Sequence, residues 1–319
     1  MKKKKIGLAI GGGAAYGLSA IGVLKALEEN CIPIDVISGT SIGAVIGALY
    51  ASGMKSFNLE DELLGTEWKE LLDFVLPQKG LVSGKKIENY LRGLLQNKTF
   101  EELKIPLYIT AVDIKQGQQI IFNKGDVASA VRASISIPGI FTPVEMDGMT
   151  LVDGGVLDPV PTDVLKEHSD MIIAIDFEKE IKSSYASAKK EKSEFLEGLQ
   201  KEFLENEIKY IQDYLKQGKI RIPIPFRWFL SPNYIYKTIK KQSLPISSFQ
   251  IFDITKKSYH LMASEMAKLK LQNNKPDILI KPDLSKMNWL EFDKGDYAMK
   301  QGELATKEKI SEIKKIMKR

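Results

Sequence analysis

Cysteine and histidine are scarce in this chain. Among its 319 residues there is one cysteine, Cys31, and there are two histidines, His168 and His260. A single cysteine excludes an internal disulfide and a metal site built on several cysteines. We expect neither a metal nor a cofactor. Two histidines leave few candidates for any chemistry that needs an imidazole base.

Long hydrophobic runs are also absent. No segment approaches the roughly 20 apolar residues of a membrane span, although hydrophobic residues make up 44% of the chain, enough for a large core. The N-terminal "MKKKKIGLAIGGGAAYG" begins like a signal peptide, but Gly11, Gly12 and Gly13 interrupt its apolar stretch early. We therefore expect a mature first strand and helix. We also expect a cytoplasmic protein, free or loosely held on the inner face of the membrane.

The charge of the chain is nearly balanced. Lys and Arg number 46 and Asp and Glu number 41, which gives a formal net charge of +5. Such a small basic excess is typical of a soluble protein, and it also suits an anionic membrane surface or substrate. We expect no nucleic-acid partner, and the sequence leaves the oligomeric state open.

Short apolar runs alternate with helical patterns over the first half of the chain. "KIGLAI", "DVISGT" and "LYITAVDI" are typical of buried strands, and the first two lead into helical spacing. This alternation predicts an α/β fold with a mostly parallel central sheet. After about Phe177 the sequence becomes charged and then aromatic. We expect a core over residues 1–180, a mainly helical insertion over 181–255, and a strand and helix in 256–319 that return to the core.

A serine lies between two glycines where an expected strand runs into an expected helix. In "GTSIG", Gly39 to Gly43, the G-x-S-x-G pattern predicts a sharp turn that presents the Ser41 hydroxyl at a helix N-terminus. That position favours the negative charge that develops during nucleophilic attack. We expect Ser41 to be a nucleophile; a glycine-lined helix start without chemistry is the alternative.

A second glycine-rich turn, Gly11 to Gly17, follows the first expected strand. Bare glycine turns expose backbone N–H groups, which bind a phosphate or an oxyanion. A dinucleotide fingerprint is the rival interpretation. It fits poorly, because G-x-G-x-x-G requires a glycine where this chain has Tyr16.

The third motif is Asp153-Gly154-Gly155, directly after the apolar run "MTLV". In open parallel sheets, functional groups gather at the carboxyl ends of the strands. An aspartate at such an end can therefore face the same crevice as Ser41. A turn aspartate that caps its own backbone is the alternative.

Both histidines follow Asp153 in the chain, as the order Ser, Asp, His of a hydrolase triad requires. His168 lies at the expected end of a helix, and His260 lies in an ordinary amphipathic helix. Neither has a neighbouring glycine turn or acid that marks a catalytic base.

With these motifs in this order, the chain resembles the patatin-like phospholipase family of lipid acyl hydrolases. The likeness rests on the glycine-rich turn with "GVLKALEE", on "GTSIGA", on "RASISIPGIFTPV" and on "LVDGGVLDPVP". It covers residues 5–178 and, more loosely, 275–315. The resemblance implies a three-layer α/β/α sandwich and a Ser-Asp dyad without histidine, in which Asp153 serves as the base for Ser41.

The resemblance also implies the parts that support this dyad. The backbone amides of the first glycine turn would hold the oxyanion, two glycines would form the elbow around Ser41, and two would shape the turn after Asp153. The residues are Gly11, Gly12, Gly13 and Ala14, then Gly39 and Gly43, then Gly154 and Gly155. The family usually has Arg or Lys where this chain has Tyr16, which leaves recognition of an anionic headgroup open.

We therefore expect a serine hydrolase that cleaves carboxylic esters of lipids through an acyl-enzyme. Phospholipase, lysophospholipase and simple esterase activities are not distinguished by the sequence. A lipid-binding or scaffold protein that keeps the fold with weak catalysis is the alternative. In the insertion, Phe226, Trp228 and Phe229 lie beside basic residues, which predicts a lid or a membrane-docking surface. Apolar residues of the insertion also recur at helical spacing. The other interpretation of these apolar stripes is that they make core or oligomer contacts.

Overall fold

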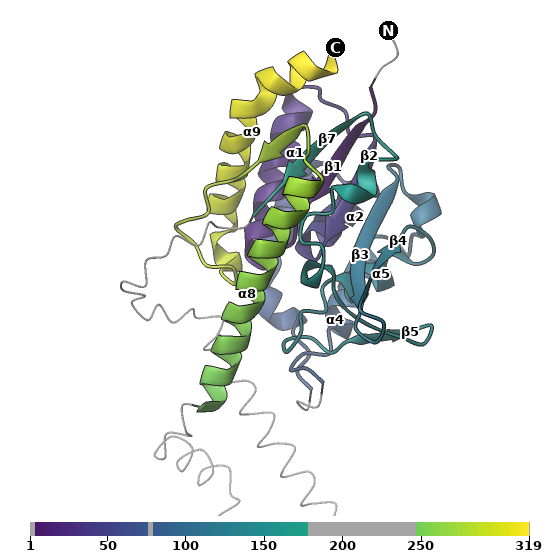
Figure 1. The fold of residues 1–319 in the computed structure, drawn as a ribbon, viewed down its shortest axis with the longest axis vertical. Helices are drawn as coiled ribbons and strands as arrows, with labels where there is room; N and C mark the ends of the chain where they lie inside the picture. The colour runs from purple at the N-terminus through teal and green to yellow at the C-terminus, as the bar shows by residue number, and fades with distance from the viewer. Residues whose placement is uncertain (1–3, 76–78, 178–246, 319) are drawn as a thin grey trace, which may run out of the picture.

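The computed structural model describes residues 4–75, 79–177 and 247–318. Within them, a sheet of eight strands lies between two layers of helices (Figure 1). The strands are β1 (Ile6–Ile10), β2 (Val36–Thr40), β3 (Leu107–Asp113), β4 (Gln118–Phe122), β5 (Val144–Met146), β6 (Met149–Asp153), β7 (Met171–Ile175) and β8 (Ile278–Ile280). The α-helices are α1 (Ser19–Glu29), α2 (Ile42–Ala51), α3 (Ser56–Leu64), α4 (Lys85–Leu94), α5 (Val127–Ser134), α8 (Ser247–Asn273) and α9 (Gly295–Met317).

The sheet is parallel at its centre and antiparallel at one edge. Its order is β5-β6-β3-β2-β1-β7-β8, with β4 also paired to β3. The pairings among β1, β2, β3, β7 and β8 are parallel, as predicted, whereas β4, β5 and β6 pair antiparallel. Short turns join β3 to β4 and β5 to β6, and adjacent strands joined by a tight turn can only run antiparallel. Between β5 and β6 the turn is Asp147-Gly148, with φ of 50° and 78°, the conformation that Asp-Gly hairpins favour.

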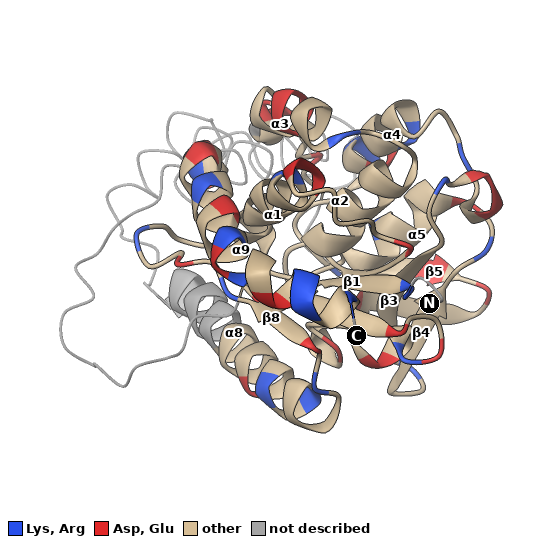
Figure 2. Cartoon of the chain, turned by 90° about the horizontal axis from the view of Figure 1, so that it is seen from above, with Lys and Arg blue, Asp and Glu red and all other residues tan. Residues whose placement is uncertain are grey.

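The two faces of the sheet are covered by different helices. On β1, the side chains of Ile6, Leu8 and Ile10 belong to the core cluster under α1, α2 and α9, whereas Ala9 packs on the side of Ala267 in α8. This alternation is the period of two that a strand imposes. Figure 2 shows α1 and α2 on one side of the strands and α8 on the other. The expected three-layer α/β/α sandwich is therefore confirmed.

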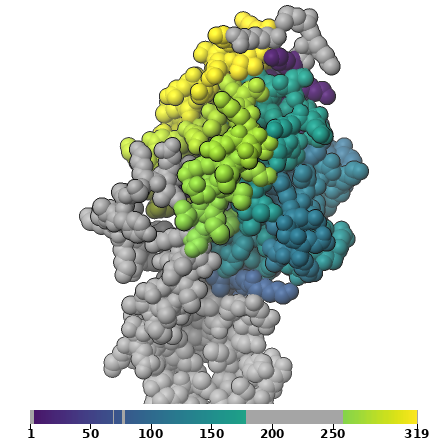
Figure 3. Space-filling model, in the orientation of Figure 1, coloured from purple at the N-terminus to yellow at the C-terminus, as the bar shows by residue number. Residues whose placement is uncertain are grey.

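The C-terminal part of the chain completes the sheet and both helix layers. β8 pairs with β7, α9 packs along α1, and α8 crosses the other face (Figure 3). The boundary expected between residues 255 and 256 falls inside α8, because this helix begins at Ser247. Phe226, Trp228 and Phe229 lie outside the described residues. No helix in the described part of the chain has both the length and the apolar character that crossing a bilayer requires.

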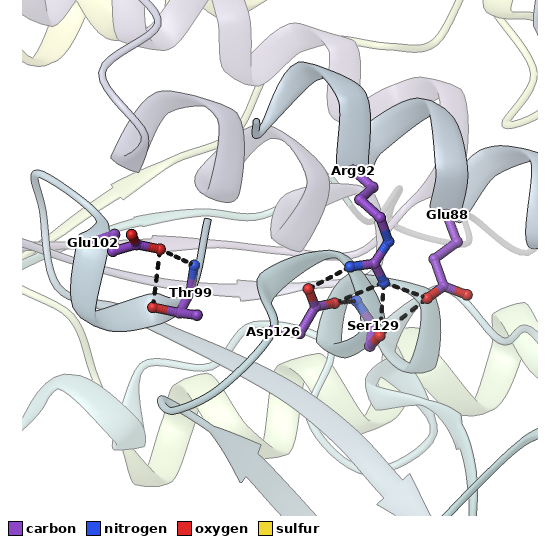
Figure 4. Close-up of polar contacts among 6 residues, drawn as sticks. All are labelled: Glu88, Arg92, Thr99, Glu102, Asp126 and Ser129. Carbon is purple, nitrogen blue, oxygen red and sulfur yellow. Dashed lines mark hydrogen bonds and ion pairs between the residues drawn. The ribbon is translucent and has the colours of Figure 1, made fainter. Parts of the chain in front are cut away.

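Polar contacts fix the N-terminus of α5 (Figure 4). Asp126 caps this helix by accepting from the backbone N–H of Ser129 at 2.7 Å. Arg92 of α4 donates to both oxygens of the same carboxylate, at 2.5 and 2.9 Å, a bidentate arrangement that is stronger than a single contact. The capped helix ends at Ser134, which is completely buried and reaches the turn that follows β2.

Candidate active site

Ser41 occupies a strained turn between β2 and α2. Its φ of 55° and ψ of −123° lie in a region that residues with a side chain rarely adopt. The turn is held from α5, because the Ser41 N–H donates to the Ser134 hydroxyl at 2.8 Å. This is the strand-turn-helix geometry that the G-x-S-x-G pattern predicts.

The glycines on either side of Ser41 are required by close backbone packing. A Cβ on Gly39 would lie 2.6 Å from the carbonyl oxygen of Gly43, and a Cβ on Gly43 would lie 2.5 Å from that of Gly11. Both distances are too short for a real side chain. Glycine at these two positions therefore lets the end of β2 pack directly on the start of α2, and lets the start of α2 pack directly on the end of β1.

The sheet brings Asp153 to the end of β2. Along β3, β4 occupies one edge, so β2 and β6 must share the other. β2 ends at the pair Thr40 and Thr110, and β6 runs in the opposite direction and ends at the next pair, Ala111 and Asp153. The two strands therefore meet end to end, which places Asp153 beside the turn that carries Ser41.

The carboxylate of Asp153 is buried, with 1% of the residue exposed. Its Oδ1 accepts the N–H of Gly155 at 2.7 Å and the hydroxyl of Tyr259 at 3.2 Å. Its Oδ2 is also buried and has no hydrogen-bond partner among the described residues. Burial raises the pKa of Asp153 to about 6, against the opposing effects of the Ser41 hydroxyl, Gly155 and Tyr259. This carboxylate is therefore a stronger base than an exposed aspartate.

The two glycines after Asp153 allow the loop to approach its neighbours. A Cβ on Gly154 would lie 2.6 Å from the backbone oxygen of Thr110. A Cβ on Gly155 would lie 2.8 Å from the Tyr259 hydroxyl and 3.0 Å from Asp153 Oδ1. The small residues thus leave room for the contacts of the carboxylate.

The first glycine turn contributes amides of two kinds. The N–H groups of Gly11 and Gly12 donate to core carbonyls at 3.1 and 2.8 Å. Those of Gly13 and Ala14 have no intramolecular acceptor among the described residues. Of the four expected oxyanion donors, Gly13 and Ala14 are therefore the two whose amides are not already engaged with another described residue.

These groups line one cavity, which measures about 340 Å³ including the space at its mouth. Its lining includes Ser41, Asp153 and the glycine turn from the first half of the chain, and side chains that come much later. The late members are Tyr259, His260, Ala263 and Trp289. Residues near both ends of the described chain thus build one site.

A second, larger cavity opens beside Ser41. It measures about 860 Å³ including the space at its mouth, and Ser41 and Ala14 line both cavities. Apart from Ser41, its wall is almost entirely apolar or aromatic. It includes Ile42, Val45, Ile87, Leu91, Ile137, Phe141, Leu290 and Phe292. Apolar walls around a single polar group are typical of sites that bind an apolar ligand.

The two histidines lie in different places. The ring of exposed His168 stacks on Tyr108 at 4.5 Å, near the amino ends of the strands and away from Ser41. His260 lines the small cavity and packs edge-on against Trp289 at 4.3 Å. The sequence pointed to His260 only as a histidine without the marks of a catalytic base. It gave no signal for Tyr259 or Trp289, because no glycine turn or strand end marks them as parts of a site.

Tyr16 stands where the resembled family usually has Arg or Lys. Its hydroxyl donates to the Met287 carbonyl at 3.2 Å, and the N–H of Ala15 donates to the Trp289 carbonyl at 2.8 Å. The glycine turn is thus tied to the segment before α9.

The comparison with known families agrees with this geometry. A model described as patatin-like phospholipase matches residues 8–166, the segment that holds both the elbow and Asp153. The chain belongs to the patatin-like phospholipase family. The resemblance drawn from the motifs is thus confirmed.

Known relatives are similar over about half of this chain. An NTE family protein of Mycobacterium tuberculosis, Rv1063c, is 36% identical over 174 residues, which are 54% of this chain and 48% of that protein. Lysophospholipase NTE1 of Phaeosphaeria nodorum is 35% identical over 183 residues, 54% of this chain and 12% of that protein. The matched part therefore spans about half the length of the first relative and much less of the second.

The fold is also found in a solved structure. The crystal structure of VipD from Legionella pneumophila aligns with a TM-score of 0.57 at 12% sequence identity, covering 98% of this chain and 67% of that one. At this identity the likeness shows the fold alone.

Proposed function

We propose that this chain is a lipid acyl hydrolase that cleaves carboxylic esters with Ser41 as nucleophile and Asp153 as base. The observation that carries the proposal is the burial of both side chains in one cavity, where Asp153 Oδ2 has no other partner among the described residues. Membership of the patatin-like phospholipase family supports the substrate class.

In the first step, Ser41 Oγ attacks the ester carbonyl carbon and its proton passes to Asp153 Oδ2. A carboxylate with a pKa of about 6 is unprotonated at neutral pH and is more basic than a free aspartate, whose pKa is about 3.9. When the tetrahedral intermediate collapses, the carbon–oxygen bond to the alcohol breaks and the alcohol takes the proton from Asp153. Water then attacks the acyl carbon and gives a proton to Asp153. The bond from that carbon to Ser41 Oγ breaks, Ser41 Oγ takes the proton from Asp153, and the carboxylic acid leaves.

The charge that develops on the carbonyl oxygen needs fixed donors. The uncommitted amides of Gly13 and Ala14 border the same cavity as Ser41, and the N-terminus of α2 begins directly after the nucleophile. Removing one such donor in known hydrolases costs about 3 kcal/mol of transition-state stabilisation. We assign Gly13 and Ala14 to the oxyanion hole.

The apolar cavity fits the acyl chain of the substrate. Ser41 lines it together with Val45 of α2 and Phe292, so an acyl chain esterified at Ser41 would lie against hydrophobic walls. This arrangement supports an acyl ester of a lipid over a small polar ester. We propose that the enzyme meets such lipids from the cytoplasm, peripherally at the inner face of the membrane, consistent with the net charge of +5.

The proposal is tested by hydrolysis of a series of acyl esters, from p-nitrophenyl esters of increasing chain length to lysophospholipids and diacyl phospholipids. We expect turnover that improves with chain length up to the capacity of the apolar cavity and that Ser41→Ala abolishes. Ser285 is exposed on the loop before α9 and lines neither cavity, so Ser285→Ala serves as the matched control with wild-type rates. Turnover that survives in Ser41→Ala would overturn the proposal. Lipid binding without turnover would favour the scaffold alternative.

A further inference from the structure

Tyr259 reaches the proposed base from a distant part of the chain. Its hydroxyl donates to Asp153 Oδ1 at 3.2 Å across 106 residues of sequence. It lies in α8, outside the matched segment 8–166. The same Oδ1 accepts the Gly155 N–H at 2.7 Å, so one oxygen of the carboxylate has two donors.

The other oxygen is left for the nucleophile. Asp153 Oδ2 is buried without a hydrogen-bond partner among the described residues, and the Ser41 hydroxyl already acts on the pKa of this carboxyl. A carboxylate free to rotate would exchange its two oxygens. Two donors on Oδ1 oppose that rotation and leave Oδ2 as the oxygen available to accept a proton.

The position of the Tyr259 hydroxyl is fixed by the packing of α8. Lys270 lies eleven residues later, about three helical turns, and so on the same face. Lys270 donates to Asp163 at 2.9 Å and lies 3.7 Å from Asp158. The helix thus makes two contacts with this part of the chain. Tyr259 contacts Asp153 at the end of β6, and Lys270 contacts Asp163 in the segment that follows.

Small residues let the helix approach closely between those points. Ala263 and Ala267 lie on this face and are 6% and 1% exposed. Ala263 lines the cavity together with Tyr259. The contact of Tyr259 with Asp153 is therefore part of a continuous interface.

We propose that Tyr259 is a positioning residue, which orients the Asp153 carboxylate so that Oδ2 receives the proton of Ser41. This inference rests on the proposed function, because it gives Asp153 the role of base. It assigns to α8 a part in catalysis that lies beyond the matched segment.

The contact has an electrostatic consequence that can be measured. The Tyr259 hydroxyl stabilises the charged carboxylate and so lowers the pKa of Asp153, opposing burial. Removing it raises this pKa, and the acidic limb of the rate profile moves to higher pH. The titratable side chains that line the cavity are Asp153, Tyr259 and His260, so His260 needs a control of its own.

The test is kcat/KM for a soluble medium-chain ester, measured from about pH 5 to about pH 9. In Tyr259→Phe we expect the acidic limb of the pH–rate profile to move to higher pH by about 0.5 to 1 pH unit. Activity should therefore fall more at pH 6 than at pH 8. Tyr297→Phe is the matched control, because the Tyr297 hydroxyl donates to the backbone carbonyl of the exposed residue Asp283 and not to a residue of the site. His260→Gln should keep the wild-type limb.

The outcomes separate this inference from the function it rests on. If Ser41→Ala is inactive and Tyr259→Phe has the wild-type limb, Tyr259 has no positioning role. A uniform loss at every pH, with a lowered melting temperature relative to Tyr297→Phe, would show a merely structural role and would also overturn the inference. Activity retained in Ser41→Ala would instead refute the proposed function.

Discussion

At the scale of single residues, Asp153 combines a gain in reactivity with a loss of stability. Burial in a cavity raises its pKa to about 6, which makes it a better proton acceptor. An unfolded aspartate has a pKa of about 3.9. The folded protein therefore holds this proton more tightly than the unfolded chain does. The stability that follows is complete below about pH 4 and is lost as the pH rises through about 6.

Replacing this charge should therefore stabilise the protein at alkaline pH while it removes activity. Asp153→Asn keeps an oxygen for the N–H of Gly155 and the hydroxyl of Tyr259 but is never ionised. We expect it to be more stable than wild type at pH 8, by up to about 3 kcal/mol, and nearly equal to it close to pH 4. Urea unfolding at both pH values measures the difference.

The exposed aspartate Asp293 provides the control, since Asp293→Asn removes a charge that is not buried. It should change stability little at either pH. If Asp153→Asn had the same pH dependence of stability as wild type, the pKa of the buried carboxylate would not be raised as we describe.

At the scale of elements, the packing of α9 against α1 depends on close contact between the two helix backbones. A Cβ on Gly302 would overlap the carbonyl of Ser19, and a Cβ on Gly22 would lie 2.8 Å from the amide nitrogen of Glu303. The two helices therefore cross at glycines. This crossing holds the segment that supplies Trp289 and Leu290 to the cavities.

Gly302→Ala should accordingly destabilise the fold although alanine is the better helix former. We expect a loss of about 2 to 3 kcal/mol, comparable to overpacking a core. Gly93 of α4 is exposed, and a Cβ there would meet no atom within 4 Å, so Gly93→Ala should be neutral or stabilise by up to about 1 kcal/mol. Thermal unfolding compares the two, and an equal effect of both substitutions would contradict the close crossing.

Whether a contact is local or distant in the chain decides which features could be predicted from the sequence. The elbow around Ser41 and the turn after Asp153 are encoded locally, by glycines whose neighbours lie close in the chain and by strand and helix patterns that flank them. The parallel centre of the sheet followed from the same patterns, and so did the strand expected within residues 256–319, which is β8.

The contribution of α8 could not be predicted in this way. Tyr259 lies in a helix whose own pattern is ordinary, and the role that we propose for it depends on a contact with Asp153 of β6 across more than a hundred residues. The engaged amides of Gly11 and Gly12 were likewise hidden, because their acceptors lie on segments that the fold brings in from elsewhere.

At the scale of the whole molecule, the site is an assembly of both halves of the chain on one sheet. The matched segment contains the proposed nucleophile, base and oxyanion donors, and the part after residue 246 adds Tyr259 and Trp289 to the lining of the cavity. His260 also lines that cavity, so the proposed Ser-Asp dyad has to be distinguished from a site with an imidazole base. We propose that Ser41 reacts through Asp153 alone.

The most direct test is the intact mass of the protein after reaction with a fluorophosphonate probe. We predict a single adduct on wild type and on His260→Ala, no adduct on Ser41→Ala, and strongly slowed labelling of Asp153→Asn. Peptide mapping should place the adduct on Ser41. Labelling that is lost in His260→Ala but kept in Asp153→Asn would contradict the account and assign the base to the histidine.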